Sequence, residues 1–305
     1  MSLTNYPNGM TSFGIPMVKG PTVPRRNGKV FFVDALYGSD SYKGRSINTP
    51  LSTLQKAIDL CTSDQGDTIY VAPGSYEEQI TVDKNYVNII GMIGGQYGWP
   101  DIEAAAGVTL SNETGQGLYL ENLRIAATAG NIAAVQSANG YIFKNVRFHG
   151  DTAASLDLRA GNTDEDDSYT ASEGWLVGCE LAWGSEGILF TNPGPSGGFG
   201  GVGPTDVRII DSVFHDITNQ DIKDVDTAGS NDSCFGKSLI HGCKFLDRNK
   251  AVYVTLTNGG GNTGLISGNF FADDAGLNGT KIAIATGIVF AGNFDAVGVR
   301  DGSTF

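Results

Sequence analysis

The side chains that could do chemistry in this sequence are mainly carboxylates that stand close together. Asp273 and Asp274 form a doublet, and a denser acidic run occupies 164–167. Paired carboxyl groups can act as general acid and base across a glycosidic bond, or they can bind calcium. These two groups are therefore the first candidates for a catalytic or metal site.

Most of the acidic residues have sequence neighbours typical of solvated loops. The run at 164–167 has few apolar neighbours, and a charge run of this kind is usually exposed. We expect the same of three aspartates spaced along a later segment: Asp221, Asp224 and Asp226. We therefore predict no catalytic residue, and we keep Asp273 and Asp274 only as an alternative.

The cysteines and histidines do not have the spacing of metal sites. The four cysteines contain no C-x-x-C pair, and the three histidines, His149, His215 and His241, lie far apart in the sequence. Free cysteines are commonly small, buried core residues. We therefore expect buried cysteines, no metal site and no cofactor.

The composition indicates a turn-rich β protein. The 305 residues include 43 glycines, 40% are hydrophobic and only 17% are charged, which disfavours both long helices and a disordered chain. The net charge of −13 repels phosphate backbones and anionic lipid. No stretch reaches the roughly 18 apolar residues of a membrane span. We expect neither nucleic acid nor a membrane as a partner.

A short pattern of strand, bend and strand recurs seven times. Each copy has an apolar segment, then Asn, Cys or Ser beside a small or polar residue, then more apolar residues. The central residues are Asn122, Asn145, Cys179, Ser212, Cys243, Asn269 and Asn293. Their spacings of 23, 34, 33, 31, 26 and 24 residues suit a coil of three short strands whose extra residues leave as loops.

The intervals between copies also decide between β architectures. A propeller blade needs about 40 residues and hairpin turns. The observed intervals are too short and too uneven for blades. The fold that we expect is all-β: a right-handed, single-stranded parallel β-helix with an N-terminal capping helix.

The capping helix is expected just after the first strand, which we place at 31–34. Ser52 or Thr53 can serve as its N-cap. The apolar residues that share one face at helical spacing are Leu54, Ala57, Ile58 and Cys61. Such a helix can lie across the open end of a β-helix and cover its core.

The block after the helix carries a family resemblance. A strand and a Pro-Gly turn occupy 66–76, and further strands follow at 79–82 and 87–91. Residues 30–95 thereby resemble the N-terminal cap and first coils of the pectate-lyase-like β-helix superfamily. This resemblance strongly implies the fold and only weakly implies an activity.

The aspartate doublet is similar to that of the polygalacturonase-type hydrolases. The Ser-His-Gly block and the downstream Arg-x-Lys of that family are missing. Fragments at 148–150 and 240–242 contain His-Gly but lie upstream of Asp273 and Asp274. The residue roles of that family therefore do not transfer to this chain.

The first 28 residues are expected to form an extended arm. They contain prolines, glycines and scattered apolar side chains, too few for a core and too apolar for an inert tail. The residues expected to bind a partner are Tyr6, Pro7, Phe13, Ile15, Pro16 and Met17. Residues 5–16 resemble the start of phage structural proteins, including some linked to head assembly. We divide the chain into an anchoring arm at 1–28 and a β-helix domain at 29–305.

These observations favour a non-catalytic bacteriophage virion protein. The expected role is a capsid decoration or cement protein, or a short head spike, on the capsid surface. The arm would hold it to the major capsid protein or another virion protein, and we expect a homotrimer. Two alternatives stay open: a tailspike-type polysaccharide depolymerase or lyase that uses carboxylates such as Asp273 and Asp274, and a glycan-binding module with aromatics such as Trp183 and Phe199.

Overall fold

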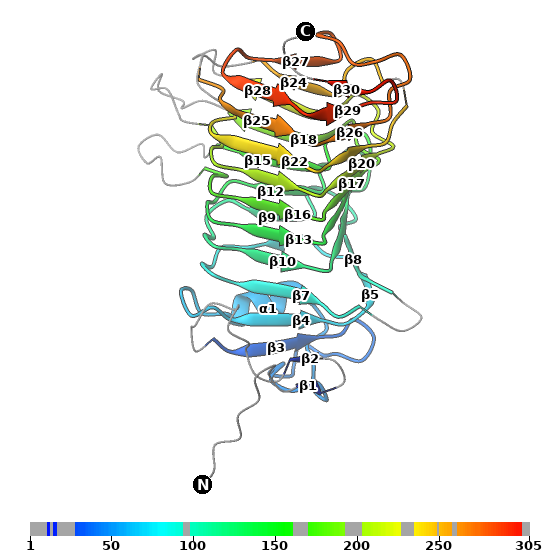
Figure 1. Cartoon of the computed structure of the whole chain (residues 1–305). Helices are drawn as coiled ribbons and strands as arrows, with labels where there is room; N and C mark the ends of the chain where they lie inside the picture. Colours follow the sequence, from blue (N-terminus) through cyan, green and yellow to red (C-terminus); the bar gives the residue numbers. More distant parts are fainter. Residues whose placement is uncertain are drawn as a thin grey trace.

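The three-dimensional arrangement of the chain was established from a computed structural model. It describes residues 11–12, 15–16, 28–93, 98–160, 170–192, 203–226, 235–248, 250–257 and 261–300. These residues form one short helix and three sheets, coiled into a right-handed parallel β-helix (Figure 1). The predicted fold class, including the helix near the N-terminal end of the rod, is confirmed.

Each full coil contributes one strand to each of three sheets. Sheet 1 consists of β3 (Val30–Val33), β4 (Thr68–Val71), β7 (Asn88–Gly91), β10 (Tyr119–Glu121), β13 (Ile142–Lys144), β16 (Trp175–Val177), β19 (Arg208–Ile210), β22 (Ser238–His241), β25 (Gly264–Ser267) and β28 (Ile288–Ala291). Sheet 2 consists of β5 (Gly74–Tyr76), β8 (Pro100–Glu103), β11 (Arg124–Ala126), β14 (Arg147–His149), β17 (Glu180–Ala182), β20 (Val213–His215), β23 (Lys244–Phe245), β26 (Phe270–Phe271), β29 (Asn293–Phe294) and β30 (Val299–Arg300).

Sheet 3 completes each coil. It consists of β6 (Ile80–Thr81), β9 (Leu110–Asn112), β12 (Ala134–Gln136), β15 (Leu156–Arg159), β18 (Glu186–Asn192), β21 (Gln220–Asp226), β24 (Val254–Leu256) and β27 (Ile282–Ile284). The strands of the three sheets pair in parallel, except that β30 pairs antiparallel with β29. The register therefore stacks equivalent residues of successive coils above one another.

The corner between sheets 1 and 2 is the most regular bend of the coil. Its first residue has a positive φ in seven coils: 59° at Asn122, 51° at Asn145, 61° at Gly178, 50° at Asp211, 69° at Gly242, 66° at Gly268 and 61° at Gly292. Gly, Asn and Asp are the residues that adopt this left-handed conformation most readily. The sequence pattern thus marks the corner correctly.

The predicted alignment of the copies is wrong by one residue in the first two. Asn122 and Asn145 occupy the left-handed position, whereas Cys179 and its later equivalents occupy the position after it. The reason is that Asn can fill either position. Cys61, Cys179 and Cys243 are buried free thiols, as expected, and Cys234 lies outside the described residues.

The dry interior of the rod is lined by columns of apolar side chains. In sheet 2 the inward column includes Phe214, Phe245 and Phe271, whose rings stack at centroid distances of 4.7 and 4.4 Å. Because parallel pairing keeps equivalent residues in register, one aromatic side chain lies directly over the next. Each inward position contributes to a core that is continuous along the axis.

The N-terminal end of the rod is sealed by helix α1 (Leu54–Leu60). Thr53 is its N-cap, and Leu54, Ala57 and Ile58 are buried, as predicted. The Gln55 side chain donates to Thr81 O at 3.2 Å and accepts from Thr81 N at 2.7 Å, so it satisfies backbone groups at the edge of sheet 3. The helix therefore closes both the core and an exposed strand edge.

Parts of the predicted arm and loops lie outside the described residues. Ile15 and Pro16 form β2 (Ile15–Pro16), which pairs antiparallel with β1 (Thr11–Ser12). The residues not described include Tyr6, Pro7, Phe13, Met17, Phe199 and the acidic run at 164–167. The division into an arm and a β-helix domain stays a prediction. No helix in the described ranges is long and apolar enough to span a membrane.

The aromatic column supplies a test of which face of sheet 2 is the core. Phe271 is fully buried, whereas its neighbour Phe270 is 41% exposed. Phe271→Ala should lower the free energy of unfolding by about 3–5 kcal/mol, since it leaves a cavity in the stack. Phe270→Ala, the matched control, should cost less than about 1 kcal/mol. Urea unfolding followed by circular dichroism measures both, and equal losses would contradict the inward orientation of Phe271.

Candidate functional site

The edge where sheet 2 passes to sheet 3 gathers polar side chains from several coils. We call it the 2–3 edge, formed by the connections 183–185, 216–219 and 246–253. Adjacent connections are tied by hydrogen bonds from Thr218 N to Gly184 O at 3.0 Å and from Asn219 N to Ser185 O at 2.8 Å. Side chains far apart in the sequence are thereby stacked within one or two coils of each other.

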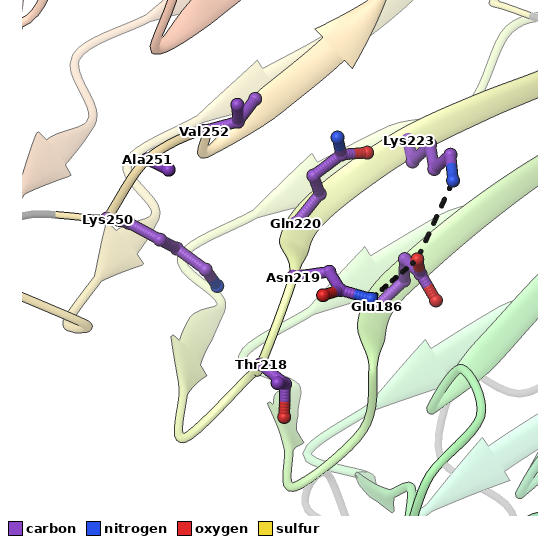
Figure 2. Close-up of a pocket in the computed structure, with 8 residues that line it drawn as sticks. All are labelled: Glu186, Thr218, Asn219, Gln220, Lys223, Lys250, Ala251 and Val252. Carbon is purple, nitrogen blue, oxygen red and sulfur yellow. Dashed lines mark hydrogen bonds and ion pairs between the residues drawn. The ribbon is translucent and has the colours of Figure 1, made fainter.

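A pocket of about 300 Å³ opens at this edge (Figure 2). We call it the edge pocket. It is lined by Glu186, Thr218, Asn219, Gln220, Lys223, Lys250, Ala251 and Val252. Its wall offers a carboxylate, two ammonium groups, two amides and a hydroxyl, with a small apolar patch beside them. This mixture of hydrogen-bond donors and acceptors suits a ligand that carries many hydroxyl groups.

One wall of the edge pocket is organised around Glu186. Its carboxylate lies 3.7 Å from Lys223 Nζ and 3.5 Å from Asn219 Nδ2, as Figure 2 shows. The strand pairing of β18 with β21 explains this contact, because Glu186 stands opposite Gln220 and the side chains of Glu186 and Lys223 share the outer face. Glu186 is thus fixed by charge and by register.

The opposite wall is organised around a buried ion network. Lys250 Nζ lies 2.7 Å from Asp221 Oδ1 and 3.2 Å from Asp247 Oδ2. The side chains of Lys250 and Asp221 are only 7% and 1% exposed. Burial raises the pKa of the Asp221 carboxyl to about 7, although the Lys250 ammonium acts in the opposite direction. The lysine therefore balances charge inside the wall.

The edge pocket also holds an acceptor without a partner. Within the described part of the chain, Gln220 Oε1 is buried and receives no hydrogen bond. A buried acceptor of this kind costs free energy unless a donor reaches it. A ligand hydroxyl or a water molecule in the pocket would supply that donor.

A second group of side chains lies on the sheet 2 side of the same edge. We call it the histidine cluster: His149, Glu180, Trp183 and His215. His149 Nε2 lies 2.8 Å from Glu180 Oε1, and His215 Nε2 lies 3.5 Å from the same oxygen. The Trp183 ring packs edge-on against His149, at a centroid distance of 4.3 Å. Trp183 is nevertheless 49% exposed, so part of its ring is free for contact.

The charges of the histidine cluster are set by its own contacts. His149 Nδ1 accepts a hydrogen bond from Arg124 Nε at 2.8 Å, which leaves Nε2 to donate to Glu180. Burial lowers the pKa of His149, partly opposed by Glu180, so the ring is neutral at pH 7. Burial acts to raise the pKa of Glu180, but the His149 hydrogen bond and the Arg147 charge give a net shift downward. Glu180 is therefore ionised.

The aspartate doublet singled out from the sequence is placed away from the edge pocket lining. Asp273 is fully buried and pairs with Lys281, and Tyr253 Oη lies 3.3 Å from its Oδ2. Asp274 is exposed and lies 2.5 Å from Arg248. The two carboxyl groups thus point into different surroundings. Neither lines the pocket.

The prediction that Asp221, Asp224 and Asp226 lie in a loop is wrong. All three belong to strand β21, and Asp221 and Asp224 are fully buried. Parallel pairing with β18 overrides the local polarity. The buried charges are met by partners: Lys250 for Asp221, and Asn262 Nδ2 at 2.9 Å for Asp224.

The histidine cluster and the Glu186 wall were missed at the level of sequence. A usable signal existed, since Phe148-His149 and Phe214-His215 occupy the same column of the aligned copies, two coils apart. In the described ranges no three His, Cys, Asp or Glu side chains are arranged to hold a metal ion.

Comparisons with known proteins extend the description of the fold. The lacto-N-biosidase of Eubacterium ramulus matches with a TM-score of 0.62 and 14% identity over 88% of this chain, which spans 56% of the enzyme chain. The pectin methylesterase of Aspergillus niger matches with a TM-score of 0.53 and 16% identity, covering 88% of this chain and 85% of the enzyme. Both show that this chain has the fold of the pectate-lyase-like β-helix proteins.

The ORF18 protein of Geobacillus virus E2 also matches, with a TM-score of 0.44 and 15% identity, covering 87% of this chain and 62% of that protein. At this TM-score the likeness carries no argument about function. No protein-family model matches the sequence, and no curated protein matches it.

The buried ion network generates a prediction about pH. With its pKa raised, folded Asp221 keeps a proton that the unfolded chain releases above about pH 4. Its contribution to stability is therefore full below about pH 4 and is lost as the pH rises to about 7. Asp221→Asn cannot ionise, so its free energy of unfolding should fall less than that of the wild type between pH 4.5 and 7.5. Parallel pH profiles in the two proteins would contradict this assignment.

A second variant probes the lysine of the same network. Lys250→Met removes the ammonium group that lowers the Asp221 pKa, so the loss of stability should extend to higher pH. Above pH 7 the variant should lose about 3–5 kcal/mol, the cost of a buried charge without its partner. Urea unfolding at each pH measures both effects.

Proposed function

We propose that this chain is a non-catalytic structural protein of a bacteriophage virion, a rigid rod that is attached through its N-terminal segment. It lies on the capsid surface as a decoration or cement protein or a short head spike. Its partner there is the major capsid protein or another virion protein. The body of the rod presents the 2–3 edge to a surface carbohydrate.

The attached end is the one where the chain enters the rod. β3 is the outermost strand of sheet 1, and α1 lies near it (Figure 1). The segment that precedes β3 is rich in proline and glycine and carries the apolar residues expected to bind a partner. Its likeness to the start of phage structural proteins supports the virion assignment.

The edge pocket, together with the exposed face of Trp183, is the observation that carries the carbohydrate-binding part. Its donors and acceptors can bind hydroxyl groups, and an exposed aromatic ring can stack on the apolar face of a sugar. Lys223 and Lys250 are already paired with carboxylates. A neutral sugar therefore fits the pocket better than an acidic one.

The placement of the aspartate doublet is why catalysis is left out of the proposal. Asp273 is fully buried and held by Lys281 and Tyr253, where a polysaccharide does not reach it. Asp274 stands outside, paired with Arg248. An acid and base across one glycosidic bond would need both carboxyl groups to face the same groove.

A homotrimer is also part of the proposal. One register row on the outer face of sheet 1 carries several partly exposed apolar side chains. They are Ile142, Trp175, Leu265 and Val289. A surface of this kind suits contact between identical copies.

The virion assignment is tested by location. Antibody labelling of phage particles in electron micrographs should place the protein on the head. A chain that lacks residues 1–28 should keep the circular dichroism spectrum of the full chain but fail to associate with particles. Association of the shortened chain, or absence of label from particles, would refute attachment through this segment.

The carbohydrate assignment is tested by a matched pair of tryptophans. Trp183→Ala should weaken binding of neutral oligosaccharides, measured by calorimetry, by about three- to tenfold, the loss of one stacking contact. Trp175→Ala changes a ring of similar exposure on sheet 1, 38% against 49%, and should leave binding unchanged. Equal effects would remove the 2–3 edge as the binding surface, and release of reducing ends would show that the protein is an enzyme.

A further inference from the structure

The charges of this chain are unevenly distributed along the rod. The first 60 residues contain seven of the 20 basic residues but only three of the 33 acidic ones. The chain as a whole carries a net charge of −13. The N-terminal end therefore contrasts in sign with the acidic body that follows it.

A second pocket lies at this end, between β3, the following loop and helix α1. We call it the basal pocket. It has a volume of about 400 Å³ and is lined by Lys29, Phe31, Asp40, Tyr42, Lys43, Arg45, Lys56 and Leu60. Four cations thus surround an apolar floor. The Arg45 guanidinium lies over the Phe31 ring, with Cζ 5.2 Å from the ring centroid.

The one carboxylate in the basal pocket is already used by the helix. Asp40 accepts hydrogen bonds from Ser52 N at 3.0 Å, Thr53 N at 3.1 Å and Thr53 Oγ1 at 2.8 Å. Burial acts to raise the pKa of Asp40, but these hydrogen bonds give a net shift downward, so it remains ionised. Its role is to fix the start of α1.

The cations, in contrast, have no acidic partner. Within the described ranges, none of the four basic side chains of the basal pocket forms an ion pair with a carboxylate. Lys43 and Arg45 are exposed, and Tyr42 beside them is 45% exposed. An unpaired cationic rim around aromatic and aliphatic side chains is complementary to an acidic segment that also carries apolar residues.

We propose that the basal pocket binds an acidic peptide segment of the partner protein, one in which Asp or Glu alternates with aromatic or aliphatic residues. This inference rests on the attachment proposed above and names the chemistry of the partner. The carboxylates contact the rim at Lys43, Arg45 and Lys56, and an apolar side chain contacts Phe31 and Leu60. The folded end of the rod thereby recognises the partner together with the preceding segment.

The charge of this chain's own N-terminal segment argues against that segment as the occupant. Residues 1–28 contain Lys19, Arg25 and Arg26 and no Asp or Glu. Placing them in the basal pocket would bring like charges together. The carboxylates must come from another molecule, and the acidic body of a second copy is the competing source.

The test uses the full chain and a fluorescent peptide of five Glu-Phe repeats, with five Lys-Phe repeats as the control peptide. Fluorescence anisotropy should show binding of the Glu-Phe peptide alone, and raising NaCl from 50 to 500 mM should weaken it. Lys43→Glu with Arg45→Glu should weaken it about tenfold or more, because attraction becomes repulsion at the rim.

The matched control reverses two exposed lysines on the body, Lys237→Glu with Lys244→Glu, which changes the net charge by the same amount. This variant should bind within twofold of the wild type. Equal weakening by both variants, or no binding of the Glu-Phe peptide, would overturn the proposal. Light scattering that shows self-association of the wild type, abolished by the basal variant alone, would overturn it in favour of a second copy.

These measurements do not use phage particles. Peptide binding with no label on particles would therefore refute the virion assignment and leave the pocket chemistry standing. Label on particles without peptide binding would do the reverse.

Discussion

The parallel register between successive coils is the constraint on which the whole structure depends. Each coil must return the chain to the same three faces, one strand spacing further along the axis. The left-handed corner makes this possible, since Asn122, Gly178 and their equivalents turn the chain sharply at the same point in each coil. Backbone hydrogen bonds across the corner, such as Gly178 N to Ile210 O at 3.0 Å, then lock one coil to the next. Apolar columns, polar edges and pockets all follow from that repetition.

The same register explains how charged groups come to lie inside the protein. Strands β18 and β21 pair over six residues, and the pairing carries Asp221 and Asp224 into buried positions. A buried charge is tolerated only when a partner reaches it. Lys250 and Asn262 meet these two carboxylates from later coils. The wall of the edge pocket is thus a by-product of neutralising a strand that the register forces inward.

Sequence and structure agree where the local signal and the fold require the same thing. The corner residues and the apolar face of α1 were predictable, because left-handed turns favour Asn or Gly and a capping helix needs one apolar stripe. The carboxylates of β21 were not, since their environment depends on a lysine many residues away. The histidine cluster lay in between. Its members recur in one column, but only the true register shows that Glu180 lies between His149 and His215.

A stack of uniform coils also acts as a ruler. Along sheet 1, the coils that build the edge pocket stand five to seven strand spacings from β3, or roughly 25–35 Å at about 4.8 Å for each spacing. Duplication or loss of one coil between these points would change that height by a fixed step and leave both pockets intact. Lineages of this protein could thus adjust how far the edge pocket stands from the base in discrete increments, without redesigning either end.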